Sequence, residues 1–340
     1  MIRSLCTGGA GMLGSHVVDS LIELGHDVVV LDDLSGGFRE NVNPKAELIR
    51  GSINDLSVLG DIFVSHQIDY IYHLGAYAAE GLSHFIRRYN YTNNLVGSMN
   101  LINAAVNHGG VKCFVFTSSI AVYGTNQIPF TESTVPRPSD PYGISKYAVE
   151  LDLEAAYQMF GLNYIIFRPF NVYGERQNLS DPYRNVVGIF MNQCMKGEPL
   201  TIFGDGKQTR AFTHVSDVAP LIARSVNIPE AYQNTFNVGA DIPYSVNRLA
   251  EAVQAAMVTR LPVTHLDKRE EVVHANSLTS KCKKVFGYQP KVTLEEGLER
   301  MASWAARRGP QKGKPFTQIE IERNMPPSWR QLSWHQCPLP

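Results

Sequence analysis

This 340-residue sequence lacks any long apolar run. A membrane-spanning helix needs roughly 20 consecutive apolar residues, and no stretch approaches that length. The amino terminus, MIRSLCTGGAG, enters its first predicted strand at once, without the apolar central region of a signal peptide. We therefore expect a cytoplasmic protein that makes no contact with a membrane.

Cysteine is scarce, and neither sign of charge is in excess. The five cysteines, Cys6, Cys113, Cys194, Cys282 and Cys337, are widely spaced and form no C-x-x-C pair. This pattern excludes a disulfide framework and a cysteine zinc site, so we expect reduced thiols, mostly in the core, and no metal ion. Lys and Arg number 31 against 32 Asp and Glu. Without a positive field the chain is not expected to bind nucleic acid.

Short apolar runs alternate with amphipathic stretches through the first half of the chain. The runs are SLCTG, DVVVLDD, DYIYHLG, CFVFTSS and NYIIFRP. Buried parallel strands are continuously apolar, and strands that alternate with helices form parallel sheets. The pattern predicts an α/β fold with a Rossmann-type, doubly wound parallel sheet, to which NTFNVG near Thr235 returns. Thr293 and Glu296 form a predicted capping box for a helix to about Ala306.

A glycine-rich loop follows the first predicted strand and precedes a predicted helix. Gly8, Gly11 and Gly14 have the spacing G-x-x-G-x-x-G, which lets a backbone turn tightly and approach a pyrophosphate at a helix N-terminus. Asp32 ends the second predicted strand, 18 residues after Gly14. A carboxylate there accepts both ribose hydroxyls and repels a 2′-phosphate, which predicts NAD rather than NADP. The alternative, glycines that only turn the chain, does not account for Asp32.

Tyr142 and Lys146 are separated by one helical turn, directly after Ser139-Asp140-Pro141, a typical helix start. A lysine ammonium favours the phenolate and so makes a tyrosine a usable base. The alternative is an exposed Tyr beside a solvated Lys. Thr117-Ser118-Ser119 follows the run CFVF, which places hydroxyls at the carboxyl edge of a parallel sheet. The two features together predict a catalytic group.

Several longer motifs occur in a fixed order: TGGAGMLGSH, LDDLSGG, YIYHLGA, NYTNNLVGSMNLINAA, FVFTSSIAVYG, PYGISKYAVE, FRPFNVYGERQ and LTIFGDGKQTRAFTHVSDVA. From Ile2 to Trp304 the chain resembles the extended short-chain dehydrogenase/reductase family, and within it the UDP-glucose 4-epimerases and their relatives. The resemblance implies an NAD-dependent enzyme that inverts C4 of a UDP-hexose through a transient 4-keto sugar. It also implies a homodimer formed by helices beginning near Asn93 and Tyr142.

The resemblance implies site residues position by position. Ser119, Tyr142 and Lys146 are the implied catalytic group. The implied cofactor residues are Gly8, Gly11, Met12, Leu13, Gly14, Asp32, Asp33, Ser35, Gly36, Ser52, Ile53, Leu74, Gly75, Ala76, Asn94, Thr117, Tyr142, Lys146 and Pro169. Ser52-Ile53 replaces the family's usual Asp-Ile pair near the adenine. The implied substrate residues, including the diphosphate ligands Arg210 and Arg269, are Ser119, Tyr142, Asn171, Asn185, Phe203, Arg210 and Arg269.

The domain prediction follows from the same patterns. We expect an NAD-binding domain over 1–170, with a return near 210–240, and a smaller α/β domain over 171–209 and 241–306 that binds the nucleotide sugar. Residues 307–340 are an extension of unassigned role. The family's substrate-gating position falls near Ala275 or Asn276, neither of which is bulky, and Leu278 replaces the family's usual Asp nearby.

The residues before the V-Y-G motif distinguish related reactions. Family dehydratases have an acid and a base there, and decarboxylases have Glu, whereas this chain has Ile120-Ala121, which cannot exchange a proton. The pattern favours epimerisation. Open alternatives are a UDP-N-acetylhexosamine or UDP-glucuronate 4-epimerase, a CDP- or GDP-sugar substrate, epimerisation at another carbon, a dehydratase, another NAD-dependent oxidoreductase, and a non-catalytic NAD-binding protein.

Overall fold

The description covers residues 2–269 and 271–334 of a computed structural model, without the side chains of 331–334. Cys337 lies outside these residues. Seven parallel strands form the central sheet in the order β11-β6-β5-β4-β1-β2-β3. The predicted Rossmann sheet is confirmed, including the return of NTFNVG, which pairs with β6 as β11. The strands are β1 (Arg3–Thr7), β2 (Asp27–Asp32), β3 (Glu47–Arg50), β4 (Tyr70–His73), β5 (Cys113–Thr117), β6 (Tyr164–Pro169) and β11 (Asn234–Val238).

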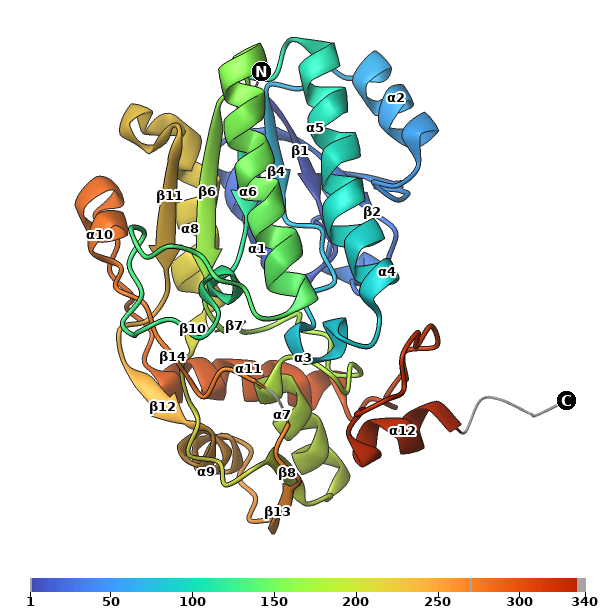
Figure 1. Cartoon of the computed structure of the whole chain (residues 1–340), viewed down its shortest axis with the longest axis vertical. Coiled ribbons are helices and arrows are strands. Elements are labelled where there is room, and N and C mark those ends of the chain that lie inside the picture. The colour runs from blue at the N-terminus through green and yellow to red at the C-terminus, as the bar shows by residue number, and fades with distance from the viewer. Residues whose placement is uncertain (1, 270, 335–340) are drawn as a thin grey trace, which may run out of the picture.

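Helices cover both faces of the sheet (Figure 1). On one face α1 (Met12–Glu23) and α8 (Val215–Arg224) share an apolar cluster with strand residues. On the other face α2 (Leu56–Ser65), α5 (Gly97–His108) and α6 (Pro141–Phe160) form a second cluster. Because both faces are covered, the five inner strands are almost fully buried and their continuous apolar character is explained, whereas the edge strand β3 is partly exposed.

A second group of elements, here called the lower lobe, lies below the carboxyl edge of the sheet in Figure 1. Its helices α7 (Val186–Lys196), α9 (Val246–Ala256) and α11 (Leu294–Arg308) share an apolar cluster with β8 (Leu200–Phe203), which pairs with β13 (Val263–Leu266). Thr293 and Glu296 form the predicted capping box. Small sheets join the lobes: β7 (Val172–Tyr173) with β10 (Thr213–His214), and β9 (Thr209–Ala211) with β12 (Pro243–Ser245) and β14 (His274–Ala275).

The remaining helices lie near the lobe boundary. α3 (Glu80–Ser83) follows β4, and α4 (Arg87–Tyr91) continues through a π-turn over Thr92–Val96 into α5. The helix α10 (Ser280–Phe286) packs against the sheet beside β11. After α11 the chain crosses beside α7 and α3 and ends its described part in α12 (Pro327–Trp334), as the red segment of Figure 1 shows. Residues 309–334 are called the C-terminal segment below.

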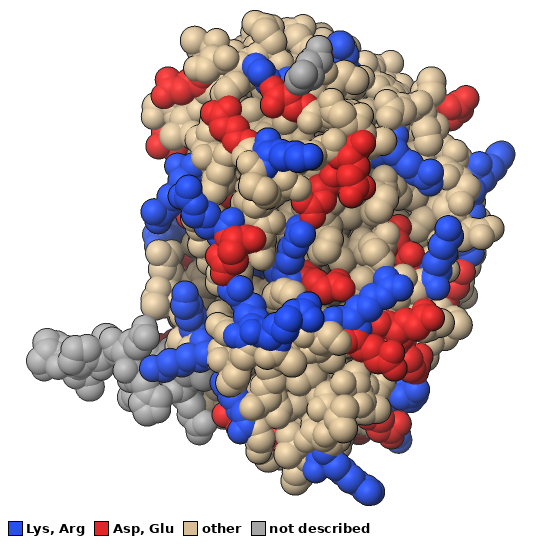
Figure 2. Space-filling view, turned by 180° about the vertical axis from the view of Figure 1, so that it is seen from behind, with Lys and Arg blue, Asp and Glu red and all other residues tan. Residues whose placement is uncertain are grey.

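The described residues were expected to contain no membrane helix, metal site, disulfide or strongly charged surface. Among the residues described, no helix is long and apolar enough to cross a membrane, and no three His, Cys, Asp or Glu side chains gather as a metal site. Cys6, Cys113, Cys194 and Cys282 are buried free thiols, as predicted. On the face in Figure 2, acidic and basic side chains are interspersed, with basic ones frequent across the middle.

Candidate active site

The glycine loop makes a tight turn between β1 and α1. Gly8 has φ +72°, and a Cβ there would lie 2.6 Å from Gly75. A Cβ on Gly14 would lie 2.0 Å from the carbonyl oxygen of Gly8, so the loop tolerates no side chain at either position. The N-cap of α1, Gly11, has no side-chain cap. The first amides of α1 therefore remain available to an anion at the helix N-terminus.

Asp32 stands at the carboxyl end of β2, facing this loop. Its carboxylate accepts the amide of Ala10 at 2.9 Å and the amide of Leu34 at 2.8 Å. Burial raises the pKa of Asp32, while these two hydrogen bonds lower it. The residue thus fixes the loop and presents an acceptor at the edge of the cleft where a ribose would lie.

A cleft of about 350 Å³ runs along the carboxyl edge of the sheet. It is lined by every predicted cofactor residue except Asn94, including Ser52 and Ile53. Asn94 is buried, and its amide group instead holds the backbone of Tyr77, accepting its N–H at 2.8 Å and donating to its oxygen at 3.1 Å. Its neighbour Asn93 lines the cleft. Both residues lie in the π-turn over Thr92–Val96.

We expect Asp32→Ala to weaken NAD binding by about 1 to 3 kcal/mol, because a charged acceptor for the ribose hydroxyls is lost. The substitution also removes the repulsion of a 2′-phosphate, so the preference for NAD over NADP should narrow. Calorimetric titration of both dinucleotides measures the two effects. Asp61→Ala on the exposed side of α2 is the control. An unchanged NAD affinity in Asp32→Ala would remove this residue from the cofactor site.

The predicted catalytic residues meet where β5 ends and α6 begins. Ser119 caps the short turn after β5, and its hydroxyl accepts the Ala121 amide at 3.1 Å. Asp140 caps α6 by accepting the amide of Gly143 at 2.9 Å. Tyr142 lies in the first turn of α6, with Lys146 one turn further on. The helix start predicted at Ser139-Asp140-Pro141 is confirmed.

Burial and hydrogen bonds set the charge of this group. Burial is the main cause that raises the pKa of Tyr142, and a hydrogen bond with Ser119 lowers it. Burial also lowers the pKa of Lys146 to about 7, although Glu150 acts in the opposite sense. The Lys146 ammonium donates to the Thr117 carbonyl at 2.8 Å. A protonated Tyr142 therefore predominates in the chain alone at neutral pH.

Polar atoms around Lys146 fit a bound dinucleotide. The hydroxyl oxygen of Thr117 is buried and has no partner among the described residues. Lys146 has three N–H donors and uses one for Thr117. Both residues line the cleft that the glycine loop and Asp32 also line. Bound ribose hydroxyls would satisfy these donors and acceptors, so the residues present fit the group.

A second pocket, of about 780 Å³, opens from this cleft into the lower lobe. Asn171 and Asn185 line both spaces, and Phe203, Arg210 and Arg269 line the pocket. The structure thus brings all the predicted substrate residues around two connected spaces, with Ser119 and Tyr142 on the cleft side.

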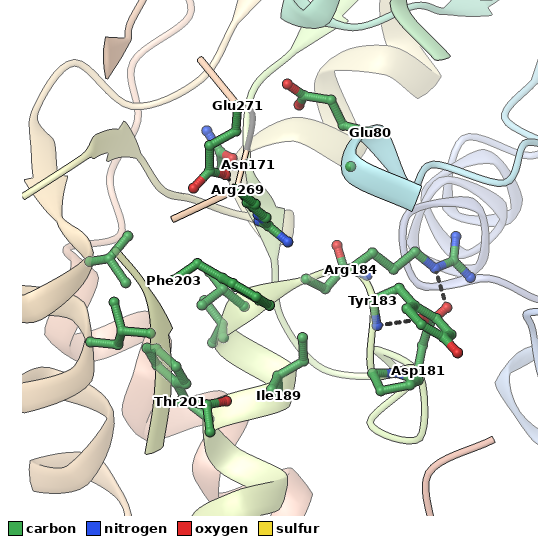
Figure 3. Close-up of a pocket in the computed structure, with 18 of the residues that line it drawn as sticks. Glu80, Asn171, Asp181, Tyr183, Arg184, Ile189, Thr201, Phe203, Arg269 and Glu271 are labelled. Atoms are coloured by element: carbon green, nitrogen blue, oxygen red, sulfur yellow. Dashed lines mark hydrogen bonds and ion pairs between the residues drawn. The ribbon is translucent and has the colours of Figure 1, made fainter. Parts of the chain in front are cut away.

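The two predicted phosphate-binding arginines are held differently. The Arg269 and Phe203 side chains lie beside each other (Figure 3). The guanidinium carbon is 4.6 Å from the ring centre, and the guanidinium pairs with Glu271 at 3.0 Å. Arg210 donates to the carbonyl groups of Thr209, Val272 and Val273. A phosphate would therefore meet Arg269 as a cation stacked on a ring and Arg210 as a cation fixed to backbone.

Acidic and basic side chains that the sequence analysis missed also line these spaces. Glu80 lies on α3 where the cleft meets the pocket, and Figure 3 shows its carboxylate reaching toward the side of Asn171 and Glu271. Burial, with Glu80 nearby, raises the pKa of Asp140 to about 7. Arg184 pairs with Asp181 at 2.7 Å. The position of Glu80, shortly after a strand end, was the available signal.

The predicted gate does not lie at the pocket surface. Ala275 is buried in a cluster with Val122 and Phe130, and Asn276 pairs through its carbonyl with the Phe130 amide. Neither residue lines the cleft or the pocket, whereas Glu271 and Val272, a few positions earlier, line the pocket.

Three features meet at the carboxyl edge of the sheet: a glycine loop, an acidic residue that ends β2, and a Ser-Tyr-Lys group. Together they define a dinucleotide-dependent enzyme of the short-chain dehydrogenase/reductase type. The family model for the NAD dependent epimerase/dehydratase family matches residues 4–239. The chain belongs to this family, and its cofactor is NAD.

Relatives and solved structures agree with this placement. A UDP-glucose 4-epimerase of Mycolicibacterium smegmatis is 34% identical over 309 residues, covering 88% of this chain and 97% of the relative. The structure of a Thermotoga maritima UDP-glucose 4-epimerase with UDP-glucose has 36% identity and a TM-score of 0.83, covering 90% and 99% of the two chains. A Thermus thermophilus UDP-glucose 4-epimerase with NAD has 31% identity and a TM-score of 0.84, covering 89% and 98%. Other relatives are named decarboxylases of UDP-uronic sugars. The chain is thus an NAD-dependent nucleotide-sugar epimerase or a related enzyme.

Proposed function

We propose that the protein interconverts the C4 epimers of a UDP-hexose, with UDP-glucose and UDP-galactose as the first pair. One observation carries this choice within the family. Ser119 and Tyr142 share the cleft with Lys146, and the turn after Ser119 continues with Ile120-Ala121, which has no ionisable group. Proton chemistry is therefore concentrated on one sugar oxygen.

The chain's residues hold and move the proton at that oxygen. Ser119 donates a hydrogen bond to O4, and Tyr142 takes the proton from O4 as a phenolate. The positive charges of the Lys146 ammonium and of a bound nicotinamide would favour this phenolate over the protonated form that predominates in the chain alone. NAD, when bound beside Lys146 and Thr117, would supply a reversible hydride acceptor for C4, with no net consumption of cofactor. The large pocket beside the cleft leaves room for the 4-keto sugar to rotate between the two hydride transfers. This rotation is required because the second hydride must reach the opposite face of the sugar ring.

The nucleotide part would be held in the lower lobe. Arg210 and Arg269 suit the diphosphate because guanidinium groups match phosphate oxygens. Asn171, at the junction of the two spaces, would reach the same group. Phe203 offers a ring for the base, and Asn185 lines the connection to the cleft.

Two carboxylates bear on the sugar's identity. Glu80 and Asp140 both raise the pKa of Tyr142 through their charge. A uronic sugar would add a further anion beside them, which favours a neutral hexose over UDP-glucuronate. The same Glu80 makes a dehydratase the second candidate, because it is an ionisable group near Tyr142 that Ile120-Ala121 does not provide.

The reaction is expected to be a redox-neutral isomerisation. NMR of a UDP-sugar panel in D₂O should show interconversion from either epimer, no deuterium at C3, C5 or C6, and no NADH in solution. A stable 4-keto-6-deoxy product would favour the second candidate, and carbon dioxide from UDP-glucuronate would indicate decarboxylation. In either case the epimerase assignment fails, while the NAD site and the Tyr142–Lys146 pair survive.

We also propose a homodimer formed through α5 and α6. Apolar side chains on and beside these helices are exposed in the single chain, among them Val96, Ile144 and Leu151. Exposed apolar residues grouped on neighbouring helices are typical of an interface. Figure 1 shows α5 and α6 side by side on the outer face of the sheet, so two copies could pack them into a four-helix contact.

A further inference from the structure

The C-terminal segment connects the two lobes beside the substrate pocket. On the lower lobe, Asn192 of α7 and the backbone of Gln311 exchange hydrogen bonds of 2.9 and 2.8 Å. On the sheet side, the Glu320 carboxylate accepts the amides of Arg88 and Tyr89, at 2.7 and 2.8 Å, at the start of α4. These contacts at Gln311 and Glu320 hold the first half of the segment at two points beside the pocket.

Trp329 anchors this segment in a cluster of aromatic rings. Its side chain is 3% exposed. The indole meets the rings of Tyr183, Phe203 and Phe85 edge-on, at centroid distances of 5.4, 5.9 and 6.2 Å. Edge-to-face contacts at these distances are favourable. Phe203 is the ring offered to the base, so Trp329 supports that ring directly.

Trp329 also confines Arg269. The guanidinium carbon of Arg269 lies 4.6 Å from the Phe203 ring centre and 5.6 Å from that of Trp329, so two rings hold the cation. A Cβ on Gly81 would lie 3.3 Å from the Trp329 ring and 3.6 Å from an Arg269 nitrogen. The absence of a side chain at Gly81 thus leaves room for this arrangement.

Two polar atoms of residues that line the pocket have no hydrogen-bond partner among the described residues. The Ser328 hydroxyl oxygen and the Arg269 Nε atom are buried and without a hydrogen bond among the described residues. Ser328, Trp329 and Arg269 all line the pocket. Buried polar groups are normally paired, so an unpaired donor and an unpaired hydroxyl on residues that line one pocket indicate a place for a polar ligand.

The relatives match this chain over nearly their whole length, but the match covers only about nine-tenths of this chain. The sequence resemblance ends at Trp304, before the C-terminal segment. We propose that the C-terminal segment forms a wall of the nucleoside-diphosphate site, with Ser328 as a ligand-binding residue and Trp329 as the residue that positions Arg269 and Phe203. This inference rests on the proposed nucleotide-sugar function. It assigns to residues beyond α11 a part in binding the nucleotide.

The test is calorimetric titration of UDP into the NAD-loaded, full-length protein and its variants. Ser328→Ala should raise the Kd for UDP about fivefold to tenfold, because one hydrogen bond is lost, with no loss of thermal stability. Trp329→Ala should raise it roughly tenfold or more, with a matching rise in KM and little change in kcat or NAD affinity. Trp329→Phe should restore most of the binding, and Ile321→Ala, exposed in the same segment, is the control.

The outcomes separate this inference from the function on which it rests. If wild type binds UDP and Ser328→Ala binds it as wild type does, with Trp329→Ala unaffected or unfolded, the wall is overturned and the function stands. If wild type binds no UDP, the proposed function fails and the inference with it. Ser328→Ala keeps the test decisive if Trp329→Ala does not fold, since it removes a single unpaired hydroxyl.

Discussion

Tyr142→Phe is expected to lower turnover by about 10² to 10⁴, the usual worth of a positioned proton transfer. The phenol is buried at the carboxyl edge of the sheet, and its pKa responds to Ser119 through a hydrogen bond. Removing the oxygen leaves the ring and its packing in place. Binding of UDP and of NAD should therefore stay within about twofold, because both ligands contact other residues.

Steady-state kinetics with the preferred UDP-sugar, together with calorimetry of both ligands, measures this prediction. Tyr147→Phe is the matched control, since Tyr147 lies on the same helix but packs in the cluster around Val122 and Phe130. Turnover of Tyr142→Phe within about tenfold of wild type would eliminate this residue as the base. A parallel loss of UDP affinity would instead point to a collapsed pocket.

The predictable part of the site consists of short-range patterns. The glycine spacing, Asp32 at a strand end and the Tyr142–Lys146 turn each depend on a few neighbouring positions, and the backbone rules for those positions are strong. The sheet was predictable for the same reason, because fully buried strands such as β5 are continuously apolar.

The features that escaped prediction depend on contacts across long stretches of chain. Trp329 meets Phe203 and Tyr183 only after the chain has crossed from one lobe to the other. Together with burial, Glu80 raises the pKa of Asp140, which is far away in the sequence. Asn94 holds the backbone of Tyr77, a contact between separate elements of the chain. A periodicity or motif of one segment contains none of this information.

Below the catalytic group lies a buried polar network that supports it. Arg168 of β6 donates from Nε to Glu150 at 2.9 Å and from Nη1 to the Tyr123 hydroxyl at 2.7 Å. Ser118, next to Ser119, donates to the same Glu150 carboxylate. Glu150 stands one turn after Lys146 on α6. The network thus ties the strand end that holds Ser119 to the helix that holds Tyr142 and Lys146.

Arg168→Met is expected to destabilise the protein by about 3 to 5 kcal/mol, because it leaves a buried carboxylate without its cation. Arg168 is 5% and Glu150 2% exposed, so water cannot replace the lost partner. Burial lowers the pKa of Arg168, but the hydrogen bond to Glu150 and the charge of Glu150 raise it, so this contact favours the charged guanidinium. Urea unfolding followed by circular dichroism measures the change in the free energy of unfolding.

The exposed pair Arg248–Glu295 provides the control, since its side chains are 43% and 49% exposed. Arg248→Met should cost at most about 1 kcal/mol, because solvent screens such a pair. Combining Arg168→Met with Glu150→Leu should recover much of the loss, since the double change removes both members of the buried ion pair. Equal effects of Arg168→Met and Arg248→Met would show that the buried pair is no more than a surface contact in energetic terms. A double variant as unstable as Arg168→Met would place the cost in packing rather than in the unpaired charge.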